Sequence, residues 1–212
     1  MKHRAHSAAV MMVIVGVLAP ALSSAQRSIS CQRRCGHQVA QCVLERGGVE
    51  GHYVRNRCSR EIVGQCRRRG PAACPLPSRE ELAGTLAAVQ ALEVEVHDSP
   101  VCVATLPALP AGSVDDAITA GRDTAAALAG TTDPSFRPIA RNIRGGAFKK
   151  FFLGVSLHGE AFWPLADAVR AMARPTRTVG YTTDSGDPIV YGVVGSADGI
   201  AMGVLLTRCP SD

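Results

Sequence analysis

The apolar positions along the chain follow three successive patterns. Residues 8–22 form one short, continuous apolar run. Between residues 31 and 74, cysteines occupy the apolar positions at helical spacing, and arginines fill much of the sequence between them. From residue 78 onward, stretches of helical periodicity alternate with stretches typical of strands. The patterns predict a leading apolar segment, a small cysteine-based helical unit and a larger mixed domain.

The cysteine-rich segment predicts an antiparallel pair of helices over about 30–45 and 53–69, separated by a glycine-rich break at 47–51. Three cysteines of the first helix project within about 40° of one another, and the two of the second helix, eight residues apart, also share a face. A unit this small needs covalent staples, because it buries too little apolar surface. The cysteines of the two facing sides are Cys31, Cys35, Cys42, Cys58 and Cys66.

Nested disulfides are the expected way to join two antiparallel helices. The predicted pairs, beginning nearest the turn, are Cys42–Cys58, Cys35–Cys66 and Cys31–Cys74. Six cysteines allow many other pairings, so the connectivity stays open at this point. The two remaining cysteines, Cys102 and Cys209, are expected to form a fourth disulfide that closes a loop of about a hundred residues.

The segment from residue 77 to 212 predicts an α+β domain in which an antiparallel sheet packs against helices. Ser78 and Glu81 form the sequence signature of a capping box at a helix start. A second amphipathic helix is expected over 162–173, and residues 115–129 fit either a short helix or an irregular insertion. Turn residues separate the expected strands, which cover 93–97, 101–106, 176–182, 188–195 and 200–208.

The first 25 residues have the organisation of a cleavable signal peptide. Lys2, His3 and Arg4 precede the apolar run, and the small residues of 23–25 follow it. A membrane anchor is the alternative, although the run is short for a bilayer and contains Pro20. No later stretch is long and apolar enough to span a membrane. We therefore expect a secreted or periplasmic location, which also suits an even number of cysteines.

The net charge of +5 conceals two segments of opposite sign. Residues 26–76 contain ten arginines and three glutamates, whereas residues 77–212 contain four more acidic than basic residues. The basic segment is expected to bind phosphates, anionic lipid head groups or an acidic partner, with a plain solvated helix face as the alternative. Its candidate polyanion-binding residues are Arg55, Arg57, Arg60, Arg67, Arg68 and Arg69.

Neither a metal centre nor a catalytic centre is expected, and no cofactor is implied. His37 and His52 lie among the cysteines, but the close ligand pairs typical of zinc sites are missing from the sequence. No nucleophile elbow of the Gly-x-Ser-x-Gly type is present. An unrecognised hydrolase with His97 or His158 as its base remains the enzymatic alternative to a binding protein.

The order of elements in residues 79–212 resembles the nuclease A inhibitor family. The start matches through Leu82 to Leu92 and Val94 to Asp98, and the middle, 107–160, matches poorly. The cysteine segment is similar to an Arg-rich hairpin of exported bacterial proteins, which the inhibitor family lacks. The end gives the best match, through Leu165 to Arg170, Thr178 to Thr182, Ile189 to Gly195 and Ile200 to Val204.

The resemblance implies that the domain binds a protein partner and inhibits a nuclease. In that family an acidic residue of the early turn and the terminal carboxylate approach the metal site of the enzyme, which places these roles on Asp98 and Asp212. Carboxylates are suitable ligands for Mg²⁺. The expected function is thus that of an exported, non-enzymatic protein whose α+β domain binds a protein partner, with a nuclease as the candidate partner. The alternative is an envelope-associated protein that binds polyanions or lipids through its Arg-rich hairpin.

Overall fold

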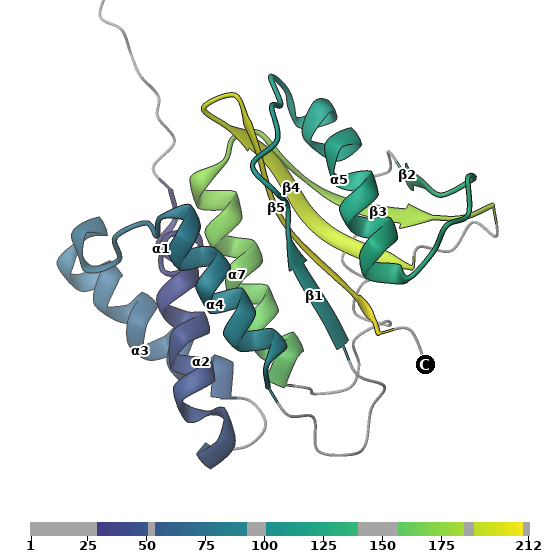
Figure 1. Cartoon of the computed structure of the whole chain (residues 1–212). Helices are drawn as coiled ribbons and strands as arrows, with labels where there is room; N and C mark the ends of the chain where they lie inside the picture. The colour runs from purple at the N-terminus through teal and green to yellow at the C-terminus, as the bar shows by residue number, and fades with distance from the viewer. Residues whose placement is uncertain (1–28, 51–53, 93–100, 140–156, 185–188, 210–212) are drawn as a thin grey trace, which may run out of the picture.

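The computed structural model describes residues 29–50, 54–92, 101–139, 157–184 and 189–209 of the 212-residue chain (Figure 1). The predicted signal peptide, the expected strand over 93–97, Asp98 and Asp212 lie outside the described residues. The described chain forms a five-stranded antiparallel sheet with helices on both faces, preceded by a disulfide-bonded helical hairpin. The predicted α+β class is therefore confirmed.

The strands run in the order β1-β5-β4-β3-β2, and every pair of neighbours is antiparallel. The last three strands form the predicted meander. Asp198 and Gly199, with φ of 52° and 75°, make the two-residue turn that joins β4 to β5. The short β2 was not predicted. The strands are β1 (Val101–Thr105), β2 (Arg137–Ile139), β3 (Thr176–Thr182), β4 (Val190–Ala197) and β5 (Ile200–Arg208).

Helices cover both faces of this sheet (Figure 1). The helices α4 (Arg79–Gln90) and α7 (Leu157–Met172) lie on one face, and α5 (Val114–Ala129) lies on the other. Alternate side chains of each strand enter different cores, so in β5 Val204 faces α7 while Leu205 faces α5. Burial on both faces explains why β4 and β5 are apolar almost throughout.

Local signals explain where these helices begin. The Ser78 hydroxyl accepts from the Glu81 N–H at 3.1 Å, and the Glu81 carboxylate accepts from the Ser78 N–H at 2.6 Å, which confirms the predicted capping box. Ser113 and Asp116 form a second capping box at the start of α5. This second box resolves the alternative left open for 115–129 in favour of a helix.

The hairpin packs directly onto α7 (Figure 1). It consists of α1 (Cys31–Arg34), α2 (Gly36–Glu50), α3 (Val54–Arg69) and the 3₁₀ turn η1 (Pro71–Ala73). A side chain at Gly36 would have no room, because its Cβ would lie 2.2 Å from the Pro164 carbonyl oxygen of α7. Val39 of α2 and Leu165 of α7 belong to the same buried cluster, so the hairpin and the sheet share one core.

Four disulfides join all eight cysteines. The predicted pairs Cys42–Cys58 and Cys102–Cys209 are confirmed. The other two predictions were wrong, because the observed pairs are Cys31–Cys66 and Cys35–Cys74. Disulfides at this density are typical of proteins that fold outside the cytosol.

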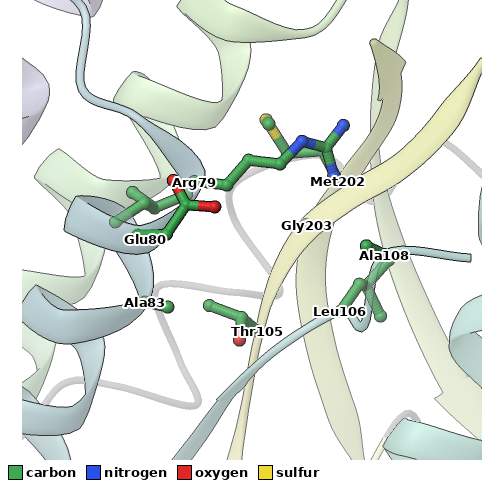
Figure 2. Close-up of a pocket in the computed structure, with 9 residues that line it drawn as sticks. Arg79, Glu80, Ala83, Thr105, Leu106, Ala108, Met202 and Gly203 are labelled. Carbon is green, nitrogen blue, oxygen red and sulfur yellow. The ribbon is translucent and has the colours of Figure 1, made fainter. Parts of the chain in front are cut away.

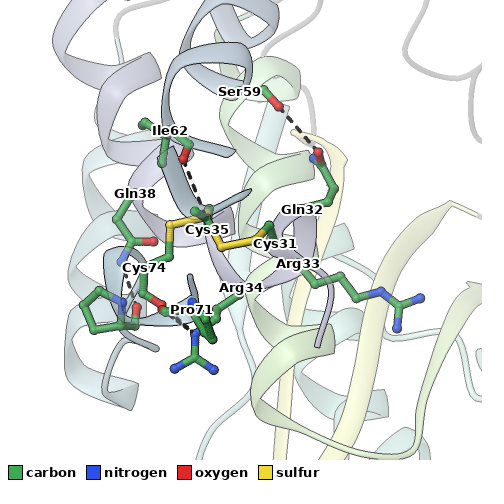
Figure 3. Close-up of a disulfide and its surroundings, with 12 residues drawn as sticks. Cys31, Gln32, Arg33, Arg34, Cys35, Gln38, Ser59, Ile62, Pro71 and Cys74 are labelled. Atoms are coloured by element: carbon green, nitrogen blue, oxygen red, sulfur yellow. Dashed lines mark hydrogen bonds between the residues drawn. A yellow bond between two sulfur atoms is a disulfide. The ribbon is translucent and has the colours of Figure 1, made fainter. Parts of the chain in front are cut away.

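A chain reversal after α3 accounts for the exchanged partners. Nested pairing assumes that the chain continues straight beyond Cys66, which would carry Cys74 to the level of Cys31. Instead, Gly70 adopts a φ of 86°, and η1 turns the chain back toward Cys35. The Arg34 guanidinium fastens this reversal by donating from Nε to the carbonyl oxygens of Pro71 and Cys74, both at 2.9 Å (Figure 3).

Among the described residues, no helix combines the length and the apolar character needed to cross a bilayer.

Candidate functional site

One exposed side of α3 carries a stripe of arginines. Arg57, Arg60, Arg67 and Arg68, which we call the arginine stripe, project within about 100° of one another and extend over about 16 Å of helix. All four are exposed, while Val54, Cys58, Val63 and Cys66 bury the opposite side of the helix. Because the disulfides fix α3, the guanidinium groups are presented on a rigid support.

One acidic side chain of the described residues, Glu61, pairs with the arginine stripe. Glu61 lies between two arginines, 3.0 Å from Arg46 of α2 and 3.3 Å from Arg57, and all three side chains are exposed. Arg60 donates to the Asn56 carbonyl oxygen at 3.3 Å. Within the described part of the chain, Arg60, Arg67 and Arg68 form no ion pair. Their charges are therefore available to an anionic partner.

Two of the six predicted polyanion-binding arginines lie away from this stripe. Arg69 projects about 100° further round the helix than Arg68. Arg55 is half-buried on the side that faces α7, and its backbone N–H donates to the Glu160 carboxylate at 2.8 Å. Glu160, itself buried, thereby satisfies a free N–H in the first turn of α3.

The predicted partner-binding residues Asp98 and Asp212 lie outside the described residues. The nearest described landmark is the Cys102–Cys209 disulfide, whose Cα atoms are 4.9 Å apart. Along the sequence, Asp98 precedes Cys102 by four residues and Asp212 follows Cys209 by three. This disulfide joins the beginning of β1 to the end of β5.

A small pocket of about 230 Å³ lies between α4 and the β1–β5 edge (Figure 2). Leu106 and Met202 contribute apolar surface, and Arg79 and Glu80 supply its charged groups. The Arg79 guanidinium is already bound to the carbonyl oxygens of Ala201 and Ala197. Hydrogen bonds from its own backbone N–H and from the Ser78 hydroxyl lower the pKa of Glu80.

A larger pocket of about 370 Å³ lies where the hairpin meets α7. Its lining combines polar side chains of α1, α3 and α7 with apolar groups, namely Gln32, Asn56, Ser59, Asp167, Trp163 and Pro164. No local spacing in the sequence indicates this pocket, because its lining residues come from four separate helices. The only available signal was Trp163, the single tryptophan of the chain.

In the described residues, one group of metal-ligand side chains converges, formed by Cys35, Cys66 and Cys74. Their sulfur atoms lie within 4.8 Å of one another, but each of them belongs to a disulfide. Figure 3 shows the two neighbouring disulfides at the base of the hairpin. Oxidised sulfur does not provide the thiolate that zinc binds.

Comparison of the chain with protein-family models, with curated proteins and with solved structures finds no match in any of the three.

Proposed function

We propose that this is an exported, non-enzymatic protein that binds phosphate-bearing polyanions or anionic lipid surfaces through the arginine stripe. The observation that carries the proposal is the exposure of Arg57, Arg60, Arg67 and Arg68 on one side of a disulfide-fixed helix. Guanidinium groups bind phosphate oxygens through paired hydrogen bonds. Because disulfides already fix α3, binding has to order the arginine side chains but not the backbone that carries them.

Binding to a phosphate surface predicts a characteristic salt dependence. The mature chain, residues 26–212, is titrated with anionic vesicles, with zwitterionic vesicles and with duplex DNA at several salt concentrations. Affinity for the anionic ligand is expected to fall steeply as salt rises, because each phosphate contact releases counterions. Whether the lipid or the DNA binds more tightly then identifies the source of the phosphate. Absent or salt-independent binding would remove the proposal.

Two double variants distinguish the arginine stripe from net charge alone. Arg60→Gln with Arg67→Gln removes two charges from the stripe, whereas Arg55→Gln with Arg69→Gln removes two charges from elsewhere on α3. The stripe variant should lose about tenfold in affinity at low salt. Its plot of log affinity against log salt concentration should be less steep by about two, and the control variant should lose less affinity. Equal losses in the two variants would show that only total charge matters.

A second candidate function is binding of a nuclease by the α+β domain. The sequence positions of Asp98 and Asp212, within four residues of the Cys102–Cys209 disulfide, favour this candidate. The excess of acidic residues in 77–212 suits a partner that normally binds nucleic acid. The observed helix and β-meander order supports the candidate as well.

The nuclease hypothesis is tested with the mature protein and a panel of sugar-nonspecific nucleases. A complex at micromolar concentration and loss of nuclease activity are expected, and Asp98→Asn should weaken both. Asp123→Asn, at an exposed position of α5, is the matched control. Failure to form any complex at micromolar concentration would eliminate this function and leave the arginine-stripe proposal untouched.

A further inference from the structure

The pocket between the hairpin and α7 has the size of a small-molecule site. Its volume of about 370 Å³ falls within the range of roughly 300–1,000 Å³ that is typical of ligand pockets. The pocket beside α4, at about 230 Å³, is below that range. The larger pocket also lies between packed helices, a common position for ligand sites.

The polar groups of this pocket keep unused hydrogen-bonding capacity. The Gln32 amide donates to the Asp167 carboxylate at 3.4 Å and accepts from the Ser59 hydroxyl at 3.5 Å (Figure 3). Both distances are well beyond the most common length of about 2.9 Å, so these bonds are weak. Asn56 adds a second exposed amide to the same lining. A ligand that offers shorter bonds would replace the existing ones at little cost.

One acceptor in the pocket is held firmly in place. The Asp167 Oδ1 atom accepts from the Arg170 guanidinium at 3.0 Å, and Arg170 also donates to the Thr178 hydroxyl of β3 at 3.4 Å. The other oxygen, Oδ2, is the one that contacts Gln32. Asp167 therefore presents an acceptor that Arg170 orients through the other carboxylate oxygen.

The remaining lining is apolar. Val39 and Pro164 are buried at the pocket, and Trp163 is half-buried there with its ring edge-to-face against Phe162 at a centroid distance of 6.1 Å. Arg55 and Asp167 are the charged residues of the lining, and their charges cancel. A site with apolar surface, two amides, a hydroxyl and no net charge suits a neutral ligand with both polar and apolar faces.

We propose that this pocket binds a neutral saccharide of one or two sugar units. Sugar hydroxyl groups both donate and accept hydrogen bonds, which matches the amides of Gln32 and Asn56 and the hydroxyl of Ser59. The C–H face of a sugar ring packs against apolar surface such as that of Trp163. The absence of net charge separates this site from the arginine stripe, which attracts anions.

Trp163 provides a direct measurement of binding, because it is the only tryptophan of the chain. The mature protein is titrated with glucose, N-acetylglucosamine, maltose and cellobiose, and Trp163 fluorescence is recorded beside calorimetric heats. A saturable fluorescence change with at least one sugar is expected, and it should persist at high salt. The same titration with neutral dipeptides examines the alternative that the site accepts peptide amides.

Matched variants assign the binding to the pocket. Asn56→Ala and Asp167→Asn should each weaken sugar binding about tenfold or more, because a buried polar group of the ligand loses its partner. Gln65→Ala changes another exposed amide of α3 that does not line the pocket, and it should bind like the parent protein. Circular dichroism confirms that each variant is folded.

Three results would overturn the proposal. The first is the absence of both saturable heat and fluorescence change up to about 50 mM of every sugar, a concentration at which even millimolar affinities saturate. The second is an equal loss of binding in Gln65→Ala and Asn56→Ala. The third is saturation by neutral dipeptides and by none of the sugars.

Discussion

Gly36 is the residue at which the backbone of α2 touches the backbone of α7. A Cβ at this position would lie 2.2 Å from the Pro164 carbonyl oxygen and 2.6 Å from the Ala168 nitrogen. These are main-chain atoms of a helix, so they do not move aside as a flexible side chain would. We expect Gly36→Ala to lower the free energy of unfolding by about 3 kcal/mol, at the upper end of typical overpacking costs.

Chemical denaturation of Gly36→Ala measures this cost, and Gly84→Ala is its matched control. Gly84 is also a helical glycine, but a Cβ there would have no atom within 4 Å. Alanine should therefore stabilise α4 by about 1 kcal/mol. If Gly36→Ala were as stable as the parent protein, the close contact between α2 and α7 would be refuted.

His37 makes the stability of the hairpin dependent on pH. Burial lowers the pKa of His37, and the carbonyl and charge of Glu81 only partly oppose that effect. The Thr85 hydroxyl donates to the Glu81 carbonyl oxygen at 2.9 Å, so Thr85 accepts from Nε2 of neutral His37 at 2.8 Å. The folded state therefore takes up the proton less readily than the unfolded state does.

The sign of the pH effect follows from this lowered pKa. An unfolded histidine binds a proton below about pH 6.5, so His37 costs no stability at pH 8 and destabilises the fold progressively below pH 6.5. His37→Gln keeps a donor for Thr85 but does not titrate. Its unfolding free energy should fall less between pH 8 and pH 5 than that of the parent protein. Equal losses in the two proteins would contradict this account.

Single residues differ in how far the sequence reveals their role. The capping box of Ser78 and Glu81 was predictable, because both of its bonds form within four residues of chain. Arg34 and Gly36 were not, because their partners lie more than thirty and more than a hundred residues away. The arginines of α3 were found from composition, and helical periodicity separates the arginine stripe from Arg69, but only the fold shows that Arg55 is half-buried beside α7.

At the scale of elements, the Cys102–Cys209 disulfide joins the outer strand β1 to β5 and closes a loop with a sequence separation of 107 residues. The chain-entropy model assigns about 4.7 kcal/mol to a loop of this length. Replacing both cysteines with serine should lower the unfolding free energy by about 4 kcal/mol, measured by denaturation. Both cysteines are half-exposed, so cavity formation adds little.

The comparison for this disulfide is a chain in which only Cys42 and Cys58 are replaced. Their separation is 16 residues, for which the same model gives about 3 kcal/mol. Buried sulfur is also lost at that position, so a cavity adds to the cost there. A change of less than 1 kcal/mol on removing Cys102–Cys209 would show that β1 is held by its hydrogen bonds and packing alone.

The same elements show the limits of pattern-based prediction. Turn residues between apolar runs were sufficient for the β-meander, whose three strands are neighbours both in the chain and in the sheet. The pairing of Cys31 and Cys35 depended instead on one backbone conformation at Gly70, which redirects the chain after α3. The spacing of cysteines on a helix face does not indicate which way the chain turns after the helix.

At the scale of the whole molecule, the division of charge does not coincide with a division of the core. The basic hairpin and the acidic domain differ in sign, yet Val39 and Val43 of α2 are buried in one cluster with Phe162 and Leu165 of α7. Arg55 and Glu160 add a hydrogen bond across the same junction. The basic surface and the acidic surface therefore belong to one packed unit, and each can attract a partner of opposite charge.

A shared core predicts that the hairpin and the sheet unfold together. In the oxidised protein, calorimetry should give one transition whose calorimetric and van't Hoff enthalpies agree. Trp163 fluorescence reports the junction and far-UV circular dichroism reports the whole chain, so the two denaturation curves should coincide. Leu165→Ala should shift both curves together by the equivalent of about 3 kcal/mol, because it leaves a cavity in the common cluster. Two separate transitions, or a shift of only one curve, would mean that the hairpin is stabilised by its disulfides independently of α7.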